Sequence, residues 1–371
     1  MKGLVVWAHS SCRSTMALYR ALENALGVPV VVAVWHYEMA PGCKDIRQAV
    51  GFRADEFADV KTISVGENSA QGLRVLDEHR GWHHLFCVYQ SSANFRRLQL
   101  EAARRGERIA IGSEAPCNMF PGWRRIAKEI YFRTKLPYVV RDVVQVSEFF
   151  VNYSGNDDRY ARLIGWSQDK IIPFGYFPPP IPGSHCVRRE NNHPFEILST
   201  GVITWHRGCD ILIDALRILK ERGIAYHATI TQNGPMKAML EAKARHWGLP
   251  VNFAGFMSLS DLNKAYETCS VYVGAGRHEP WGMRLNDALN CGAPLVVSRG
   301  MGGVKMVDDY GCGLAFENEN AFDLADKLEL LATNSSFYEK CASQALQAAQ
   351  AIQPESMARK LAEILRDRGF A

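Results

Sequence analysis

The sequence lacks long apolar runs. Its 371 residues contain no stretch of about 18 consecutive apolar side chains, the length that a membrane-spanning helix requires. The first seven residues look like a short apolar strand, whereas a signal peptide has a longer apolar segment followed by a cleavage site. We therefore expect a cytoplasmic protein without a spanning helix.

Paired cysteine motifs and a large excess of charge are also missing. The ten cysteines are scattered without a Cys-x-x-Cys pair or a nearby histidine pair, which argues against a zinc site and against a disulfide framework. A net charge of +4 is too small to indicate a nucleic-acid partner. We expect no metal, no cofactor and no nucleic acid.

What the sequence contains is enough chain for two α/β domains. In the first half, short apolar runs alternate with helical patterns, which predicts a parallel sheet covered by helices. The predicted strands span residues 4–7, 30–35, 85–89, 108–112, 144–151 and 171–173.

A proline-rich stretch, residues 178–194, divides the chain because proline disfavours both helices and central strands. The alternation resumes over residues 195–353, which predicts a second Rossmann-like domain. Residues 1–177 form the predicted first domain. A last helix, within 354–371, is expected to cross back to it.

One motif in the second half combines a strand, a loop and a capped helix between residues 270 and 298. Glu279 lies in the loop, and Asp287 follows about 12 Å farther on if the segment is helical at about 1.5 Å per residue. Backbone N–H groups at Gly282–Arg284 could bind a diphosphate at the helix start. Carboxylates on either side suit hydroxyl-bearing groups such as a sugar and a ribose.

This motif resembles the signature of retaining GT-B glycosyltransferases of family 4, the type that builds bacterial lipopolysaccharide, capsule and exopolysaccharide. The family signature is Glu, seven residues, Glu; here the second acid is Asp287. The resemblance implies that Glu279 contacts the donor sugar, that Gly282 and Met283 hold the diphosphate, and that Asp287 holds the ribose. On spacing alone, a surface helix with acidic residues near its start is an equally good interpretation.

Other motifs of the same family follow in the same order. Gly201 ends a strand, and His206-Arg207-Gly208 then precedes a helix with apolar residues at 211, 212, 215, 216 and 219. The resemblance gives Arg207 the role of the family's lysine, a cation that stabilises the leaving diphosphate. Where the family has an arginine, this chain has Val202, so one cation has been lost or moved.

Two further positions bear on the same predicted site. Gly255 ends the strand that in the family precedes a helix near the nucleoside base, and Ser260 is the predicted N-cap of that helix. The family usually has a glutamate after the glycine-rich turn at residues 300–303, but this chain has Lys305.

The acceptor side of the first domain is less defined by the sequence. Ser11 and Glu114 follow predicted strands and are the acceptor-side candidates, although an ordinary loop or cap group is the better explanation of each. Residues 120–135 interleave aromatic and aliphatic side chains with five cations. That composition suits an anionic membrane surface, and a basic helix with its aromatics packed inward is the alternative.

These features together predict an α/β fold with two Rossmann-like domains facing across a cleft. We expect a metal-independent, retaining transferase that moves a hexosyl group from a UDP- or GDP-linked sugar to a glycan or lipid-linked acceptor. It would act in the cytoplasm or on the inner face of the cytoplasmic membrane. Two other hypotheses are a non-catalytic relative that binds a nucleotide sugar or serves as a partner subunit, and a nucleotide-sugar epimerase.

Overall fold

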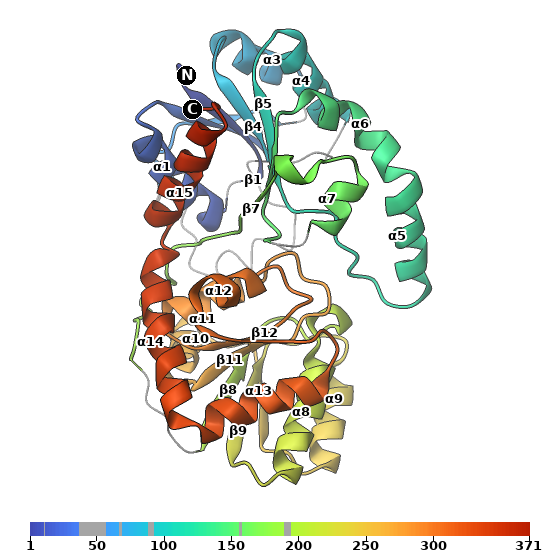
Figure 1. The fold of residues 1–371 in the computed structure, drawn as a ribbon, viewed down its shortest axis with the longest axis vertical. Helices are drawn as coiled ribbons and strands as arrows, with labels where there is room; N and C mark the ends of the chain where they lie inside the picture. The colour runs from blue at the N-terminus through green and yellow to red at the C-terminus, as the bar shows by residue number, and fades with distance from the viewer. Residues whose placement is uncertain (11, 37–56, 67–68, 88–92, 156–157, 189–193) are drawn as a thin grey trace. The chain divides into compact units, whose positions relative to one another are not determined.

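The computed structural model divides the chain into two compact units (Figure 1). It describes residues 1–371 except 11, 37–56, 67–68, 88–92, 156–157 and 189–193. The first unit comprises residues 1–116, 126–179 and 353–371, and the second comprises 117–125 and 180–352. Each unit has its own buried apolar core.

The first unit is built on a seven-stranded parallel sheet in the order β3-β2-β1-β4-β5-β6-β7. Its central strands are continuous apolar runs because helices cover both faces of such a sheet. The strands are β1 (Leu4–Ser10), β2 (Val30–His36), β3 (Thr62–Ser64), β4 (His83–Phe86), β5 (Ile109–Ser113), β6 (Phe150–Asn152) and β7 (Ile171–Pro173).

Helices connect these strands, and the last helix of the chain joins them. They are α1 (Arg13–Leu26), α3 (Ser69–Glu78), α4 (Ala93–Arg104), α5 (Trp123–Thr134), α6 (Leu136–Val146), α7 (Arg159–Leu163) and α15 (Pro354–Asp367). A short 3-10 turn, η2 (Gln168–Lys170), precedes β7. Figure 1 shows α15 beside α1, so the C-terminal helix belongs to the first unit as expected.

The second unit has a six-stranded parallel sheet in the order β10-β9-β8-β11-β12-β13. The chain order reverses between β8 and β11, the kind of switch point where ligands of open α/β sheets bind. The strands are β8 (Phe195–Ser199), β9 (Tyr226–Thr231), β10 (Val251–Gly255), β11 (Val271–Gly274), β12 (Leu295–Ser298) and β13 (Gly313–Phe316).

The helices of this unit pack their apolar faces against the sheet. The residues predicted as an apolar stripe, 211, 212, 215, 216 and 219, are all buried in α8. The elements are η3 (Trp205–Arg207), α8 (Cys209–Glu221), α9 (Lys237–His246), α10 (Leu259–Thr268), α11 (Arg284–Asn290), α12 (Val304–Tyr310), α13 (Ala321–Thr333) and α14 (Ser335–Ala351). No helix in the described ranges is both long and apolar enough to cross a bilayer.

Three local predictions need correction. The run predicted as one strand over 144–151 is divided between the end of α6 and the short strand β6, because Val140, Val143 and Val144 form a buried helical stripe. The helix α10 is capped by Ser258, whose side chain accepts the Asp261 N–H, and not by Ser260. The edge strand β3 was not predicted, and it is only three residues long.

Candidate functional site

Glu279 and Arg207 meet at the switch point of the second sheet. Arg207 ends the 3-10 turn that follows β8, and Glu279 lies in the loop that follows β11. Since β8 and β11 are parallel neighbours, their carboxyl ends share one edge of the sheet. Two residues 72 positions apart are therefore brought together, as the resemblance implied.

Their contact is close but leaves hydrogen-bonding capacity unused. Arg207 Nη1 lies 3.1 Å from Glu279 Oε2, and their side chains are 31% and 12% exposed. Arg207 Nε and Glu279 Oε2 are both buried without a hydrogen bond to the described residues, so the pair is ionic and poorly aligned. Burial raises the pKa of Glu279 above its usual range, while the guanidiniums of Arg207 and Arg284 oppose that rise.

The main chain around Glu279 is fixed by the loop after β12. The Glu279 N–H donates to the Gly300 carbonyl at 3.1 Å, and the Glu279 carbonyl accepts the Gly302 N–H at 3.0 Å. Gly282 has a φ of 90°, and a Cβ there would lie 2.5 Å from Met301 Cε. The left-handed φ therefore favours glycine at this motif position, whereas the end of the Met301 side chain could move aside.

A second ion pair clamps the two site loops together. Arg277 Nη1 and Nη2 donate to the two carboxylate oxygens of Asp210 at 2.8 and 2.7 Å, and Nη1 also donates to the Trp205 carbonyl. The Arg277 N–H reaches the carbonyl of His206. These bonds join the loop of Glu279 to the loop of Arg207. The sequence interpretation gave neither partner a role, although both lie within the stretches that it used.

Arg284 is a third cation at this edge; the sequence interpretation used its main-chain N–H group but gave its side chain no role. It occupies the first position of α11, between the two motif acids, and its Nη1 lies 3.8 Å from Asp287 Oδ2. The neighbouring Tyr266 hydroxyl contributes to a raised pKa of this guanidinium, which burial opposes. That hydroxyl also bonds Thr200 Oγ1 at 2.8 Å, so α10, α11 and the end of β8 are linked. Its position between the two motif acids was the signal available in the sequence.

A small cavity of about 20 Å³ lies where these elements converge. Arg207, Arg284, Gly201 and Gly282 are among its lining residues. Such a volume admits about one water molecule. A larger ligand would have to lie over its rim.

Other predicted residues are placed as follows. Met283 is the N-cap residue of α11 and is 48% exposed. The helix begins only at Arg284, so the helical spacing assumed between Glu279 and Asp287 does not apply. Gly255 ends β10 with a φ of 66° and is not among the residues that line the small cavity.

The acceptor-side candidates are Glu114 and Ser11, and Val202 and Lys305 are the residues that differ from the family pattern. Glu114 is an exposed residue just after β5, and Ser11 lies outside the described residues. Val202 is 43% exposed and brings no charge. Lys305 Nζ lies 2.9 Å from Asp309 Oδ2 within α12, so its charge is paired locally.

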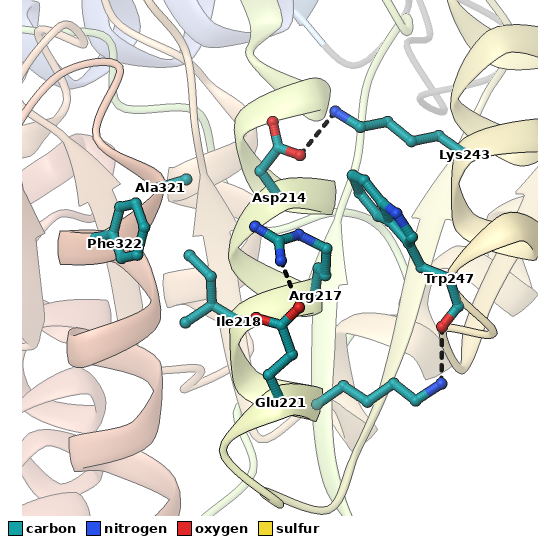
Figure 2. A pocket seen from close by; sticks show the side chains of 9 residues that line it. Asp214, Arg217, Ile218, Glu221, Lys243, Trp247, Ala321 and Phe322 are labelled. Atoms are coloured by element: carbon teal, nitrogen blue, oxygen red, sulfur yellow. Dashed lines mark hydrogen bonds and ion pairs between the residues drawn. The ribbon is translucent and has the colours of Figure 1, made fainter.

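A larger hollow lies on the outside of the second unit, between α8, α9 and the start of α13 (Figure 2). Its volume is about 830 Å³. Lys243 is paired with Asp214 at 2.7 Å, and Arg217 is paired with Glu221. Arg217 and Lys243 both lie over the ring of Trp247. Because its cations already have partners, this hollow lacks the unpaired donors found around Arg207.

The parallel sheets and the switch-point site define a class, the two-Rossmann-domain proteins of the GT-B fold. Two solved structures share this fold over the whole chain. One is a glycosyltransferase from Rickettsia africae, with a TM-score of 0.65, 13% identity, and coverage of 99% of this chain and 98% of that one. The other is Anabaena Alr3699/HepE in complex with UDP and glucose, with a TM-score of 0.63, 14% identity and coverage of 99% and 100%.

Sequence similarity is concentrated in the second unit. Residues 185–348 match the family model described as Glycosyl transferases group 1, so this stretch carries a glycosyl transferases group 1 domain. A curated relative, the GDP-mannose-dependent alpha-(1-6)-phosphatidylinositol dimannoside mannosyltransferase of Mycobacterium tuberculosis, is 35% identical over 116 residues. That match spans 30% of this chain and 30% of the mannosyltransferase.

Proposed function

We propose that this protein is a metal-independent, retaining glycosyltransferase of family 4. It would transfer a hexosyl group from a nucleotide sugar to a glycan or a lipid-linked acceptor. The observation that carries the proposal is the pair of Arg207 and Glu279 at the switch point, with polar atoms of both side chains buried and unbonded to the described residues. Unsatisfied buried donors and acceptors cost free energy, and a polar ligand would satisfy them.

Each motif residue has a chemical task in this proposal. As the bond between sugar and diphosphate breaks, charge grows on the leaving phosphate oxygens, and a preorganised guanidinium at Arg207 stabilises that charge. Main-chain N–H groups at Met283 and Arg284, which start α11, would add donors to the diphosphate. The leaving phosphate oxygen takes the proton of the acceptor hydroxyl as the new glycosidic bond forms.

The two carboxylates would fix the ends of the donor. Glu279 would accept hydrogen bonds from hydroxyls of the hexose, and Asp287, one helical turn into α11, would accept them from the ribose. The role assigned to Gly201 and Gly282 is close approach of main chain to the diphosphate, since both have positive φ values. Gly255 would lie toward the nucleobase.

The proposed acceptor is a lipid-linked glycan at an anionic membrane. In α5, Trp123 is 74% exposed, Ile126 64% and Ile130 57%, with Arg124, Arg125 and Lys128 on the same helix. Phe132 alone of the aromatic residues in this helix is fully turned into the core. Apolar side chains beside cations suit an interface of headgroups and acyl chains. Glu114 and Ser11 remain the proposed acceptor-side residues.

Thermal unfolding with a panel of nucleoside diphosphates and nucleotide sugars tests the donor site. A ligand at 100 times its dissociation constant stabilises a protein by about 2.7 kcal/mol. Both GDP- and UDP-linked sugars belong in the panel, because the Mycobacterium relative is named as GDP-mannose-dependent and the Anabaena structure holds UDP. If no diphosphate raises the melting temperature of the cooperatively folded protein, the donor site proposed at Arg207 and Glu279 is wrong.

Turnover separates the proposal from its rivals. Glu279→Ala should abolish sugar transfer while the affinity for the nucleoside diphosphate stays within a few fold. If the wild-type protein binds nucleotide sugars but neither transfers nor hydrolyses them with any glycan or lipid acceptor, the non-catalytic hypothesis replaces ours. Release of a free 2-epimer or 4-epimer of the donor would instead support the epimerase hypothesis.

A further inference from the structure

The site lacks a cation where the resembled family has one. Val202 stands at that position, is 43% exposed and carries no charge. Lys305, the other departure near the site, is paired with Asp309 at 2.9 Å. Of the two cations that the family places on the diphosphate, only Arg207 remains at its expected position.

Arg284 lies in the right place to supply the missing charge. It lines the same small cavity as Arg207, Gly201 and Gly282. The guanidiniums of Arg207 and Arg284 both oppose the rise in the pKa of Glu279 that burial causes. Two guanidiniums therefore line one cavity, although Arg207 ends η3 and Arg284 begins α11.

The surroundings of Arg284 position its guanidinium beside the cavity. A guanidinium has five N–H donors. Here the Tyr266 hydroxyl lies nearby, and Nη1 lies 3.8 Å from Asp287 Oδ2, beyond hydrogen-bonding distance. Tyr266 is itself held by Thr200, the residue before Gly201. The side chain is thus positioned by two elements at the edge of the small cavity.

The net charge of the site also favours a second cation on the diphosphate. Arg207 and Arg284 face Glu279 and Asp287, so the four side chains sum to zero net charge. A diphosphate brings additional negative charge, and α11 is only seven residues long with few unpaired N–H groups. With one guanidinium, the bound site would be strongly negative; with two, the excess is reduced.

We propose that Arg284 is the second diphosphate-binding cation of the donor site and replaces the arginine that Val202 displaced. This inference rests on the proposed function and adds a binding residue that the family signature does not supply. The planar guanidinium would bind two phosphate oxygens at once. Asp287 would then turn from Arg284 to the ribose when the donor binds.

Isothermal titration of the full chain tests the inference, with GDP and UDP as probes and guanosine and uridine as their uncharged counterparts. The variants are Arg284→Gln, which keeps a donor for Tyr266, and Arg284→Met, which keeps the apolar stem. In both, affinity for the matching diphosphate should fall about 10- to 100-fold, the usual effect of losing a charged hydrogen bond. Affinity for the nucleoside should stay within about twofold of wild type.

Two further variants test whether Arg284 has only a structural role. Val202→Arg combined with Arg284→Gln should recover at least about tenfold of the lost diphosphate affinity, since it returns a cation to the family position. Lys305→Met, which removes a locally paired charge, should change diphosphate affinity less than about twofold. Equal loss of nucleoside and diphosphate binding, or failure of the double variant to recover affinity, would contradict the inference.

The outcomes also separate this inference from the proposed function. If wild-type protein binds no nucleoside diphosphate, the donor site itself is wrong and the inference falls with it. If wild type binds and both Arg284 variants bind equally well, the donor site stands and Arg284 has no part in holding the diphosphate.

Discussion

Glu279 is a buried carboxylate whose environment disfavours its charged form. Burial raises its pKa, and the guanidiniums of Arg207 and Arg284 reverse that rise only in part. A group whose pKa is higher in the folded protein binds protons more tightly there than in the unfolded chain. Ionising it therefore lowers the free energy of unfolding. The site retains the carboxylate at a cost in stability, which is typical of residues kept for binding or chemistry.

Glu279→Gln should accordingly stabilise the ligand-free protein at neutral pH while it abolishes sugar transfer. The gain should be absent below the unfolded pKa, about 4.3, and should grow as pH rises through the higher folded pKa. Urea unfolding between pH 4 and 8 measures it. Glu363→Gln, an exposed glutamate on α15, is the matched control and should show no such trend. A wild-type protein that is more stable than the variant at pH 7 would contradict the assigned pKa direction.

At the scale of elements, α8 begins so close to the end of β11 that only glycine fits between them. Gly208 has a φ of 66°, and a Cβ there would lie 1.9 Å from the carbonyl oxygen of Ala275. Gly208→Ala should reduce the free energy of unfolding by about 2–4 kcal/mol through backbone strain and displacement of that carbonyl. Turnover should fall as well, because Arg207 precedes this glycine.

The other end of the same helix supplies the control for that measurement. Gly223 has a similar φ of 74°, but nothing lies within 4 Å of a Cβ placed on it. Gly223→Ala should cost only the strain of a left-handed residue, about 1 kcal/mol. Equal losses for the two variants in urea unfolding would show that the approach to Ala275 is relaxed in solution.

The helix α5 allows a test of the proposed membrane contact. Replacing Trp123, Ile126 and Ile130 together by serine should lower binding to vesicles that contain phosphatidylglycerol by at least about tenfold, since each apolar side chain contributes through burial. Sedimentation with vesicles measures the bound fraction. Phe322→Ser is the control, because Phe322 is 65% exposed and lies in a different helix, α13. Unchanged binding of the triple variant would exclude α5 as the contact.

Most elements of the second unit could be predicted because their patterns are local. The apolar stripe of α8 and the motif from β11 to β12 lie within single stretches of sequence. The division of 144–151 between α6 and β6 was not predictable, since a valine-rich run suits a helix and a strand equally. The contacts of Arg277 with Asp210 and of Arg284 with Tyr266 depend on which loops the sheet brings together. A local sequence pattern does not contain that information.

At the scale of the whole molecule, the first unit is completed by the end of the chain. Leu361 and Leu365 of α15 are fully buried, and the Phe370 carbonyl accepts a hydrogen bond from the His83 ring at the start of β4. A chain ending at Ile352 should therefore lose the stability of its first unit, since each such side chain contributes about 1.5–3 kcal/mol. Residues 180–352 should stay folded.

Limited proteolysis with mass spectrometry checks this prediction. Early cleavages should fall between residues 1 and 179, whereas the stretch from 195 to 352 should resist the protease. Leu361→Ala should show a weaker form of the same pattern, and Glu363→Ala, exposed on the same helix, should resemble wild type. Uniform protection of the shortened chain would show that α15 is dispensable for the first unit.

The place of α15 also sets an order of folding during synthesis. Residues 180–352 are continuous, so most of the second unit can fold as soon as it leaves the ribosome. The first unit is translated first, yet α1 cannot pack against α15 until that helix is synthesised, more than three hundred residues later. For most of translation the apolar face of α1 lacks its partner. The nascent chain would therefore present this surface to chaperones until its last helix emerges.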